Sequence, residues 1–242
     1  RRTGGVAAAK RPITGDDGAM LSAWWPTRRS WWIVVGALAV FGALLVGVLA
    51  AGKGPLGPDL ALTSAVNRWA LDGGSFRTWQ VVTKLGESSI LTPLSVFLIL
   101  IAVAGRRWRV AAFVAIASCY SMVSWAVKVL VERPRPPIQH DYSLQQLQSF
   151  PSGHADGAMA FAMIVVCVVA MSLRGVWRVV VAVVCFAIAV LVAISRLALG
   201  VHYPSDVLAG FGLAIAWVLS VALVIAAIPA RPAVDPVPLP GK

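Results

Sequence analysis

Charged residues are scarce in this chain. Only 13% of its 242 residues are Asp, Glu, Lys or Arg, whereas 59% are hydrophobic and the mean hydropathy is +0.81. A soluble domain typically carries about a quarter charged residues. The shortage of charge therefore argues against an ordinary soluble domain and predicts an integral membrane protein.

Cysteine and acidic residues are also few. The three cysteines, Cys119, Cys167 and Cys185, stand singly inside apolar runs, which favours small buried hydrophobes over a disulfide framework or a metal site. The net charge of +11 comes from 21 Lys and Arg residues against 10 Asp and Glu residues. No basic stripe with interleaved aromatic residues accompanies that charge, so we expect no nucleic-acid partner.

Long apolar runs make up most of the sequence. A helix of about 20 apolar residues crosses a bilayer, and the runs predict an all-α polytopic membrane protein with six transmembrane helices, at about 30–52, 88–105, 110–131, 154–173, 179–194 and 204–228. Between the first two runs, Asp59 is expected to cap a short amphipathic helix over about 60–71, which ends at Gly73-Gly74 and lies in the membrane interface. The membrane domain is thus expected to cover 30–230, between a disordered cytoplasmic tail (1–29) and a Pro-rich cytoplasmic tail (231–242).

The basic residues predict the orientation of this domain. Six spans put both tails on one side of the membrane. The tails and the loops at 106–109 and 174–178 hold thirteen Lys and Arg residues against three acids, whereas the opposite loops and helix ends hold eight against seven. An excess of Lys and Arg marks the cytoplasmic side. We therefore predict a plasma-membrane protein with both termini in the cytoplasm.

A polar cluster interrupts the apolar pattern between the fifth and sixth runs. It contains Ser195-Arg196, His202, Pro204 and Asp206. Ionisable groups at membrane depth are costly and usually functional. A helix that begins at Pro204 would bring His202 and Asp206, four residues apart, toward one face. The Asp would then accept the Nδ1 proton of the histidine and leave Nε2 free to attack or bind.

Two further polar segments open to the same, extracytoplasmic side. They supply Lys128, Arg135, Ser152, Gly153 and His154. Together with Arg196 they provide three cations, which indicate an anionic ligand, and arginine matches phosphate oxygens well. A serine hydroxyl and backbone N–H groups at a helix N-terminus form an anion site. Gly153 has no side chain, so the ligand can approach the backbone closely there. The pattern predicts a phosphate site that contains two histidines.

The two histidines suggest a division of labour. His202, oriented by Asp206, fits a nucleophile, and His154 fits the acid that protonates the leaving oxygen. The cations would stabilise charge on the phosphoryl oxygens. We expect no metal and no cofactor, because the cations already neutralise phosphate and would repel a zinc ion from the two histidines and the aspartate.

At these residues the sequence resembles the type 2 phosphatidic acid phosphatase (PAP2) superfamily, which also includes vanadium haloperoxidases and bacterial acid phosphatases. The family pattern is a Lys, six residues, then Arg-Pro; a Pro-Ser-Gly-His; and Ser-Arg, five residues, His, three residues, Asp. It is matched at 128–136, 151–154 and 195–206. The resemblance implies a covalent phosphohistidine on His202, assisted by Asp206, with His154 as the acid. It also implies phosphate binding by Lys128, Arg135, Ser152, Gly153 and Arg196.

We therefore predict a metal-independent phosphatase for lipid phosphates or diphosphates that acts at the extracytoplasmic face. The loops are short and leave no soluble domain to hold a large water-soluble substrate. An isoprenoid diphosphate or phosphatidylglycerol phosphate would suit such a site. The same residues also fit a lipid-linked phosphotransferase or a non-catalytic protein that binds or transports anionic lipids. A vanadium haloperoxidase fits less well, since those relatives are soluble.

Other residues near the motifs have simpler interpretations. His140 and Asp141 stand in a polar loop, where solvated side chains are expected. Glu132 and Arg133 are interpreted as loop charges or as residues that support the site from behind. Gly210 is expected to allow close helix packing.

Overall fold

The computed structural model describes residues 30–138, 148–170, 173 and 175–228. Both predicted tails, and the loop positions His140 and Asp141, lie outside the described residues. The regular structure of the described part is helical, apart from one isolated bridge between Pro134 and Gln148. Its helices are α2 (Trp31–Ala50), α3 (Asp59–Asp72), α4 (Phe76–Lys84), α5 (Ser88–Ala104), α6 (Trp108–Ala117), α7 (Tyr120–Val131), α8 (Gly153–Ala170), α9 (Val176–Ala198) and α10 (Pro204–Ala227).

Helices form at all six places where the sequence predicts a membrane span. Among the described residues, five segments are long and apolar enough to cross a membrane: α2, α4 with α5, α6 with α7, α9 and α10. The sixth, α8, is an apolar but shorter helix over Gly153–Val169. The all-α fold is thus confirmed, with five segments of full membrane length and one shorter apolar helix.

Three details differ from the sequence-based expectation. Residues 76–84, which were not predicted to be helical, form α4, because this amphipathic segment packs against α9. The single helix expected over 110–131 is split into α6 and α7, where the backbone tightens and the N–H of Cys119 donates to the carbonyl of Ile116. The fifth run stays helical to Ala198, so that Arg196 lies in the last turn of α9.

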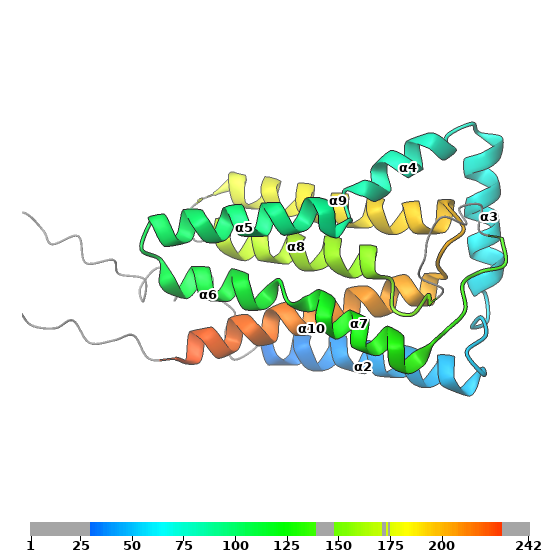
Figure 1. Cartoon of the computed structure of the whole chain (residues 1–242), viewed down its shortest axis with the longest axis horizontal. Coiled ribbons are helices and arrows are strands. Elements are labelled where there is room, and N and C mark those ends of the chain that lie inside the picture. Colours follow the sequence, from blue (N-terminus) through cyan, green and yellow to red (C-terminus); the bar gives the residue numbers. More distant parts are fainter. Residues whose placement is uncertain (1–29, 139–147, 171–172, 174, 229–242) are drawn as a thin grey trace, which may run out of the picture.

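The long helices lie side by side, and α3 runs across one end of them (Figure 1). The first turn of α2 and the last turn of α10 lie toward the opposite end. Helix α3 ends before Gly73, as predicted, but Asp59 is its first helical residue and makes no capping hydrogen bond. This aspartate has another role, described below.

Helix α10 forms the centre of the bundle. Of its membrane-length window, 67% is buried, compared with 11% for α2. It packs against α2, α6, α7 and α8. A Cβ atom at Gly210 would lie 2.8 Å from the carbonyl oxygen of Ser152, so only glycine lets α10 approach the start of α8 this closely. The expectation of close helix packing at Gly210 is confirmed.

The outer surface of the bundle is apolar. Trp32 is 78% exposed and Leu130 is 81% exposed, and many other large apolar side chains of the described helices are exposed as well. So many exposed apolar side chains are typical of a protein surrounded by lipid. Cys119 is exposed and the other two cysteines are half-buried, so the prediction that all three are buried was wrong for Cys119.

Candidate active site

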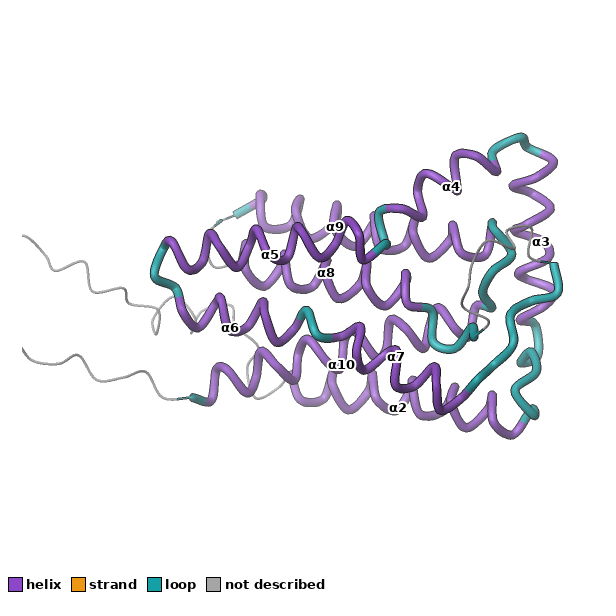
Figure 2. The backbone as a smooth tube through the Cα atoms, in the orientation of Figure 1, coloured by secondary structure: helices purple, strands orange, loops and turns teal. Residues whose placement is uncertain are grey.

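The three predicted polar segments meet at the end of the bundle that α3 crosses. Figure 2 shows the connection between α9 and α10, the loop that leaves α7 and the loop that leads into α8 at this end. The charges of Lys128, Arg135 and Arg196 all act on His202, and the same three charges act on His154. Since Ser152 and Gly153 directly precede His154, the structure brings all the predicted site residues into one region.

The turn into α10 positions His202 and Asp206. The helix begins at Pro204, as predicted, and the carboxylate of Asp206 accepts a hydrogen bond of 2.9 Å from the backbone N–H of Tyr203. His202 is 2% exposed, Asp206 is fully buried, and the His202 Nδ1 lies 3.5 Å from the Asp206 Oδ2. Within the described residues, Nδ1 makes no hydrogen bond. The expected His–Asp pair is therefore present as a close contact without a hydrogen bond.

The surroundings of His202 keep its imidazole neutral. Its pKa lies well below the ordinary value of 6.5, mainly because the ring is buried and further because of the positive charges of Arg196, Lys128 and Arg135. The backbone of Ser149 acts on the pKa in the opposite direction, with a smaller effect. A neutral imidazole has a lone pair available for attack on phosphorus, as the nucleophile hypothesis requires.

The start of α8 faces the same region. The N–H of Ser152 donates to the carbonyl oxygen of Asp206 at 3.0 Å, which fixes this turn against α10. The Ser152 hydroxyl is buried and has no hydrogen-bond partner among the described residues, so it can donate to a ligand. A Cβ atom at Gly153 would lie 3.7 Å from the Lys128 Cε, which places the two phosphate-binding candidates in contact. The N–H groups of the first helical turn complete an anion site.

The three cations come from three different helices or loops. Lys128 is 7% exposed, and its Nζ donates to the carbonyl oxygen of Gln148 at 3.3 Å. Arg196 is 2% exposed and donates to the Thr83 hydroxyl on α4, the helix that the sequence did not predict. Arg135 is half-buried in the loop after α7. Three cations that meet in one region make it strongly positive and suited to phosphate.

Arg133 is a member of the site that sequence reasoning underestimated. Its guanidinium is fully buried and donates to Asp206 Oδ1 at 2.5 Å, to the Ser205 hydroxyl at 2.8 Å and to the carbonyl oxygen of Gly54 at 2.8 Å. It also lies 4.4 Å from the ring centre of Tyr203. Glu132, by contrast, is the exposed loop charge that was expected, 3.7 Å from Lys53. Arg133 therefore holds the carboxylate that faces His202.

Asp59 supports this arrangement from α3. Its Oδ2 accepts hydrogen bonds from Arg133 at 2.9 Å and from the backbone N–H of Leu56 at 2.9 Å, and its Oδ1 accepts one from the backbone N–H of Ser205 at 3.1 Å. Its side chain is buried, whereas a helix-capping aspartate is normally solvated. The only sequence signal was an acidic residue at the start of a helix, which cannot distinguish a cap from a buried partner.

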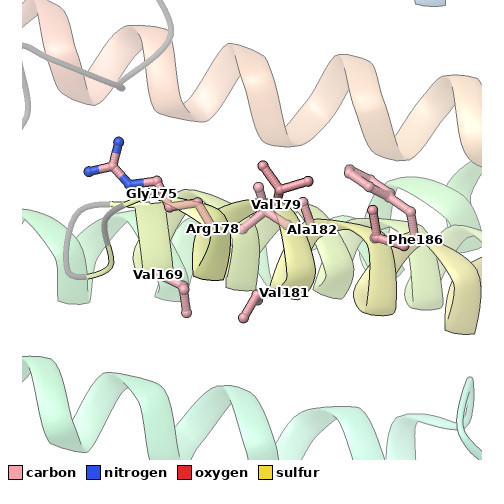
Figure 3. A pocket seen from close by; sticks show the side chains of 9 residues that line it. Val169, Gly175, Arg178, Val179, Val181, Ala182 and Phe186 are labelled. Atoms are coloured by element: carbon pink, nitrogen blue, oxygen red, sulfur yellow. The ribbon is translucent and has the colours of Figure 1, made fainter.

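The cavities of the described part of the molecule include a larger and a smaller one. The larger, of about 700 Å³, lies between the end of α8 and the start of α9, far from the predicted site, and its lining is almost wholly apolar (Figure 3). The smaller, of about 210 Å³, is lined by Gly86, Glu87, Ser88, Tyr120, Ser121, Ser124, Trp125, Lys128, Gly153, His154 and Asp156. Three of the predicted site residues, Lys128, Gly153 and His154, line this smaller cavity, so it adjoins the candidate site. Within the described residues, no group of three or more His, Cys, Asp and Glu side chains could hold a metal ion.

Comparison with known proteins agrees with the motifs. The model of the PAP2 superfamily matches residues 88–229. Phosphatidylglycerophosphatase B of Bacillus subtilis (strain 168) is 34% identical over 142 residues, which cover 54% of this chain and 66% of that protein, just under two thirds of its length.

Two solved structures share the fold. The crystal structure of the first transmembrane PAP2 type phosphatidylglycerolphosphate phosphatase from Bacillus subtilis gives a TM-score of 0.63 at 25% identity, covering 78% of this chain and 94% of that one. The structure of Aquifex aeolicus LpxE gives a TM-score of 0.52 at 22% identity over 70% of this chain and 95% of that one, which shows likeness of fold. With the family model matched over more than half of its length, this chain belongs to the PAP2 superfamily.

Proposed function

We propose that this protein is a metal-independent phosphatase for membrane lipids with a phosphate or diphosphate head group. The observation that carries the proposal is the buried His202–Asp206 pair, which faces three cations and the start of α8 at one end of an apolar helix bundle. A second histidine, His154, lies in the same region, and simple binding of a phosphate would need neither histidine. The phosphatases named above, to which the chain is similar, support the same reaction.

In the first step, the neutral His202 Nε2 attacks the phosphorus atom. A nitrogen–phosphorus bond forms while the bond from phosphorus to the lipid oxygen breaks. His154, whose protonated form is stabilised by the negative charge of the bound phosphate, gives its proton to that oxygen. Lys128, Arg135 and Arg196 would hold the equatorial phosphoryl oxygens with the Ser152 hydroxyl and the N–H groups of α8. Asp206 stabilises the positive charge that develops on the phosphorylated imidazole.

In the second step, water hydrolyses the phosphohistidine. His154, now neutral, takes a proton from the water as its oxygen attacks phosphorus, and the nitrogen–phosphorus bond breaks. Inorganic phosphate leaves, His202 is again neutral, and His154 is protonated for the next cycle. Every proton and bond is accounted for without a metal ion or cofactor.

The site is expected to face the outside of the cell. The Lys and Arg residues are concentrated in the tails and in the loops at 106–109 and 174–178. The turn between α5 and α6, the first turn of α2 and the last turn of α10 lie at the end of the bundle opposite α3 (Figure 1). This distribution favours a cytoplasmic location for that end. Helix α3 would then lie along the outer membrane surface, above the point where a lipid head group reaches the site with its tail still in the bilayer.

Phosphate release from purified protein tests the proposal. Short-chain phosphatidylglycerol phosphate and a short isoprenoid diphosphate are supplied in detergent, and inorganic phosphate is measured for the wild type, His202→Ala and Glu132→Gln. The Glu132 side chain is exposed and faces Lys53, so its variant serves as the matched control. We expect release by the wild type and the control, and a loss of at least a thousandfold in His202→Ala.

Two results would overturn the proposal. Undiminished release by His202→Ala would remove the nucleophile, and binding of lipid phosphate without any turnover would favour the non-catalytic alternative. A third arm includes an alcohol acceptor: transfer of the phosphoryl group to the alcohol in preference to water would identify a phosphotransferase.

A further inference from the structure

We propose that the 210 Å³ cavity beside His154 receives the leaving group, and that Asp156 and Glu87 select a neutral leaving alcohol bearing a further hydroxyl. An anionic leaving group, such as the second phosphate of a diphosphate, is disfavoured there. The inference rests on the proposed phosphatase function and narrows its substrate class. It applies to two acidic residues that the phosphohistidine chemistry does not use.

The position of the cavity identifies it as the leaving-group side. In phosphoryl transfer the attacking atom and the leaving oxygen stand on opposite sides of phosphorus. His154, the proposed acid, lines this cavity together with Lys128 and Gly153. His202, the proposed nucleophile, lies outside that lining, in the turn between α9 and α10. The group attached to the leaving oxygen would therefore enter the cavity.

Asp156 supplies a buried acceptor on the cavity wall. The residue is fully buried, although it belongs to the cavity lining. The Ser124 side chain and the charge of Lys128 act on its carboxyl group, yet neither oxygen has a hydrogen bond of standard geometry among the described residues. A buried polar group without a hydrogen bond is costly. A hydroxyl group that enters the cavity would provide the missing donor.

The other polar groups of the cavity point to the same chemistry. Glu87 adds a second carboxylate from the turn before α5, and the hydroxyls of Ser121 and Ser124 line the wall from α7. Lys128 is the cation in this lining, whereas Arg135 and Arg196 lie outside it. A second phosphate would meet the Glu87 carboxylate and the buried Asp156 carboxyl group, and would share one lysine with the phosphate being transferred. A hydroxyl group would instead donate to the carboxylates and accept from the serines.

The cavity also has a route to the surface of the bundle. Trp125, which lines it, is 62% exposed on the apolar outer face, and Ser88 is exposed at the start of α5. An alcohol that carries an acyl chain can therefore occupy the cavity while the chain lies against the bundle. The ligand class that fits is a lipid phosphomonoester with at least one free hydroxyl near the ester oxygen, as in a glycerol phosphate head group.

A comparison of substrates tests this inference. We would measure kcat/KM for three substrates: short-chain phosphatidylglycerol phosphate, an alkyl phosphate of matched chain length without a hydroxyl, and an isoprenoid diphosphate. The proteins compared are the wild type, Asp156→Asn, Asp156→Leu and Glu132→Gln. We expect the wild type to prefer the glycerol phosphate lipid over both others. In Asp156→Leu that preference over the alkyl phosphate falls about tenfold, since the hydrogen bond between the substrate hydroxyl and Asp156 is lost. In Asp156→Asn the relative activity toward the diphosphate rises, while Glu132→Gln resembles the wild type.

Each outcome decides a separate question. If no substrate releases phosphate in the wild type, the proposed function fails. If phosphate is released but Asp156→Leu lowers all three values by the same factor, Asp156 acts only through Lys128 or through packing, and the inference is overturned. It is also overturned if the wild type prefers the diphosphate. Thermal unfolding of each variant in detergent confirms that the compared proteins are folded.

Discussion

Arg133 is expected to be the residue on which the integrity of the site depends most strongly. Its guanidinium is buried between Asp59 and Asp206 and makes four hydrogen bonds to side-chain and backbone oxygens. Removal of one partner of a buried ion pair typically costs about 3–5 kcal/mol, because the other charge stays buried without compensation. In Arg133→Met, which keeps most of the side-chain volume, two carboxylates lose their cation at once.

The expected effect is large in two measurements. The free energy of unfolding falls by about 3–5 kcal/mol, which corresponds to a decrease in Tm of about 6–20 °C for a chain of this size. The value of kcat for phosphate release falls as well, since Asp206 is no longer held beside His202, while KM changes less because the phosphate-binding cations are untouched. Arg133→Lys is expected to retain the charge but not the forked contacts, and to be intermediate in both measurements.

A matched exposed pair provides the control. Lys53 and Glu132 lie 3.7 Å apart, with side chains 40% and 62% exposed. Exposed pairs contribute about 0–1 kcal/mol, so Glu132→Gln is expected to unfold within about 0.5 kcal/mol of the wild type. The double variant Arg133→Met with Asp59→Asn should be less destabilised than the sum of the two single variants. A stability of Arg133→Met within about 1 kcal/mol of the wild type would refute the ion-pair reasoning.

Further predictions concern packing, pH and metal ions. Gly210→Ala places a Cβ atom 2.8 Å from the Ser152 carbonyl oxygen, so it should displace the start of α8 and lower phosphate release at least tenfold. Gly36→Ala, whose added Cβ atom would have no atom within 4 Å, should leave phosphate release unchanged. Equal activities of the two variants would contradict the packing argument. The acid limb of kcat/KM that belongs to His202 should lie below pH 6.5, because the low pKa keeps the reactive neutral imidazole populated down to that pH. Measurement with two substrates whose phosphate groups differ in pKa separates the limb of His202 from a limb caused by ionisation of the substrate. An acid limb above pH 6.5 with both substrates would contradict a low pKa of His202. EDTA should not inhibit, since lysine and arginine neutralise the phosphate; strong inhibition that zinc or magnesium reverses would restore a metal mechanism.

Much of the site could be predicted from sequence because its chemistry is local. Pro204 begins α10, and the four-residue spacing brings His202 and Asp206 within 3.5 Å of each other, as the pattern indicated. The Pro-Ser-Gly-His motif likewise predicts a helix N-terminus suited to an anion, and α8 begins at Gly153 within this motif. The positions of the six apolar runs follow from hydropathy alone, since lipid selects for apolar length.

What sequence reasoning missed depends on contacts between distant segments. Asp59 and Arg133 are 74 positions apart and form a buried pair that neither local pattern contains. Helix α4 is too polar to resemble a membrane span, and its role is to pack on α9 and to bring Thr83 to Arg196. The split between α6 and α7 has no glycine or proline to mark it. These features depend on tertiary packing, which periodicity does not encode.

Isolation of a phosphoenzyme is the measurement on which the proposed mechanism depends. His154→Ala is mixed with an aryl phosphate labelled with ³²P, whose leaving group needs no protonation, and the reaction is quenched with alkali. Because hydrolysis then lacks its general base, we expect acid-labile, alkali-stable label to accumulate, and peptide mapping to place it on His202. Absence of label from His154→Ala under single-turnover conditions, or its presence in a variant that also carries His202→Ala, would show that His202 is not the nucleophile.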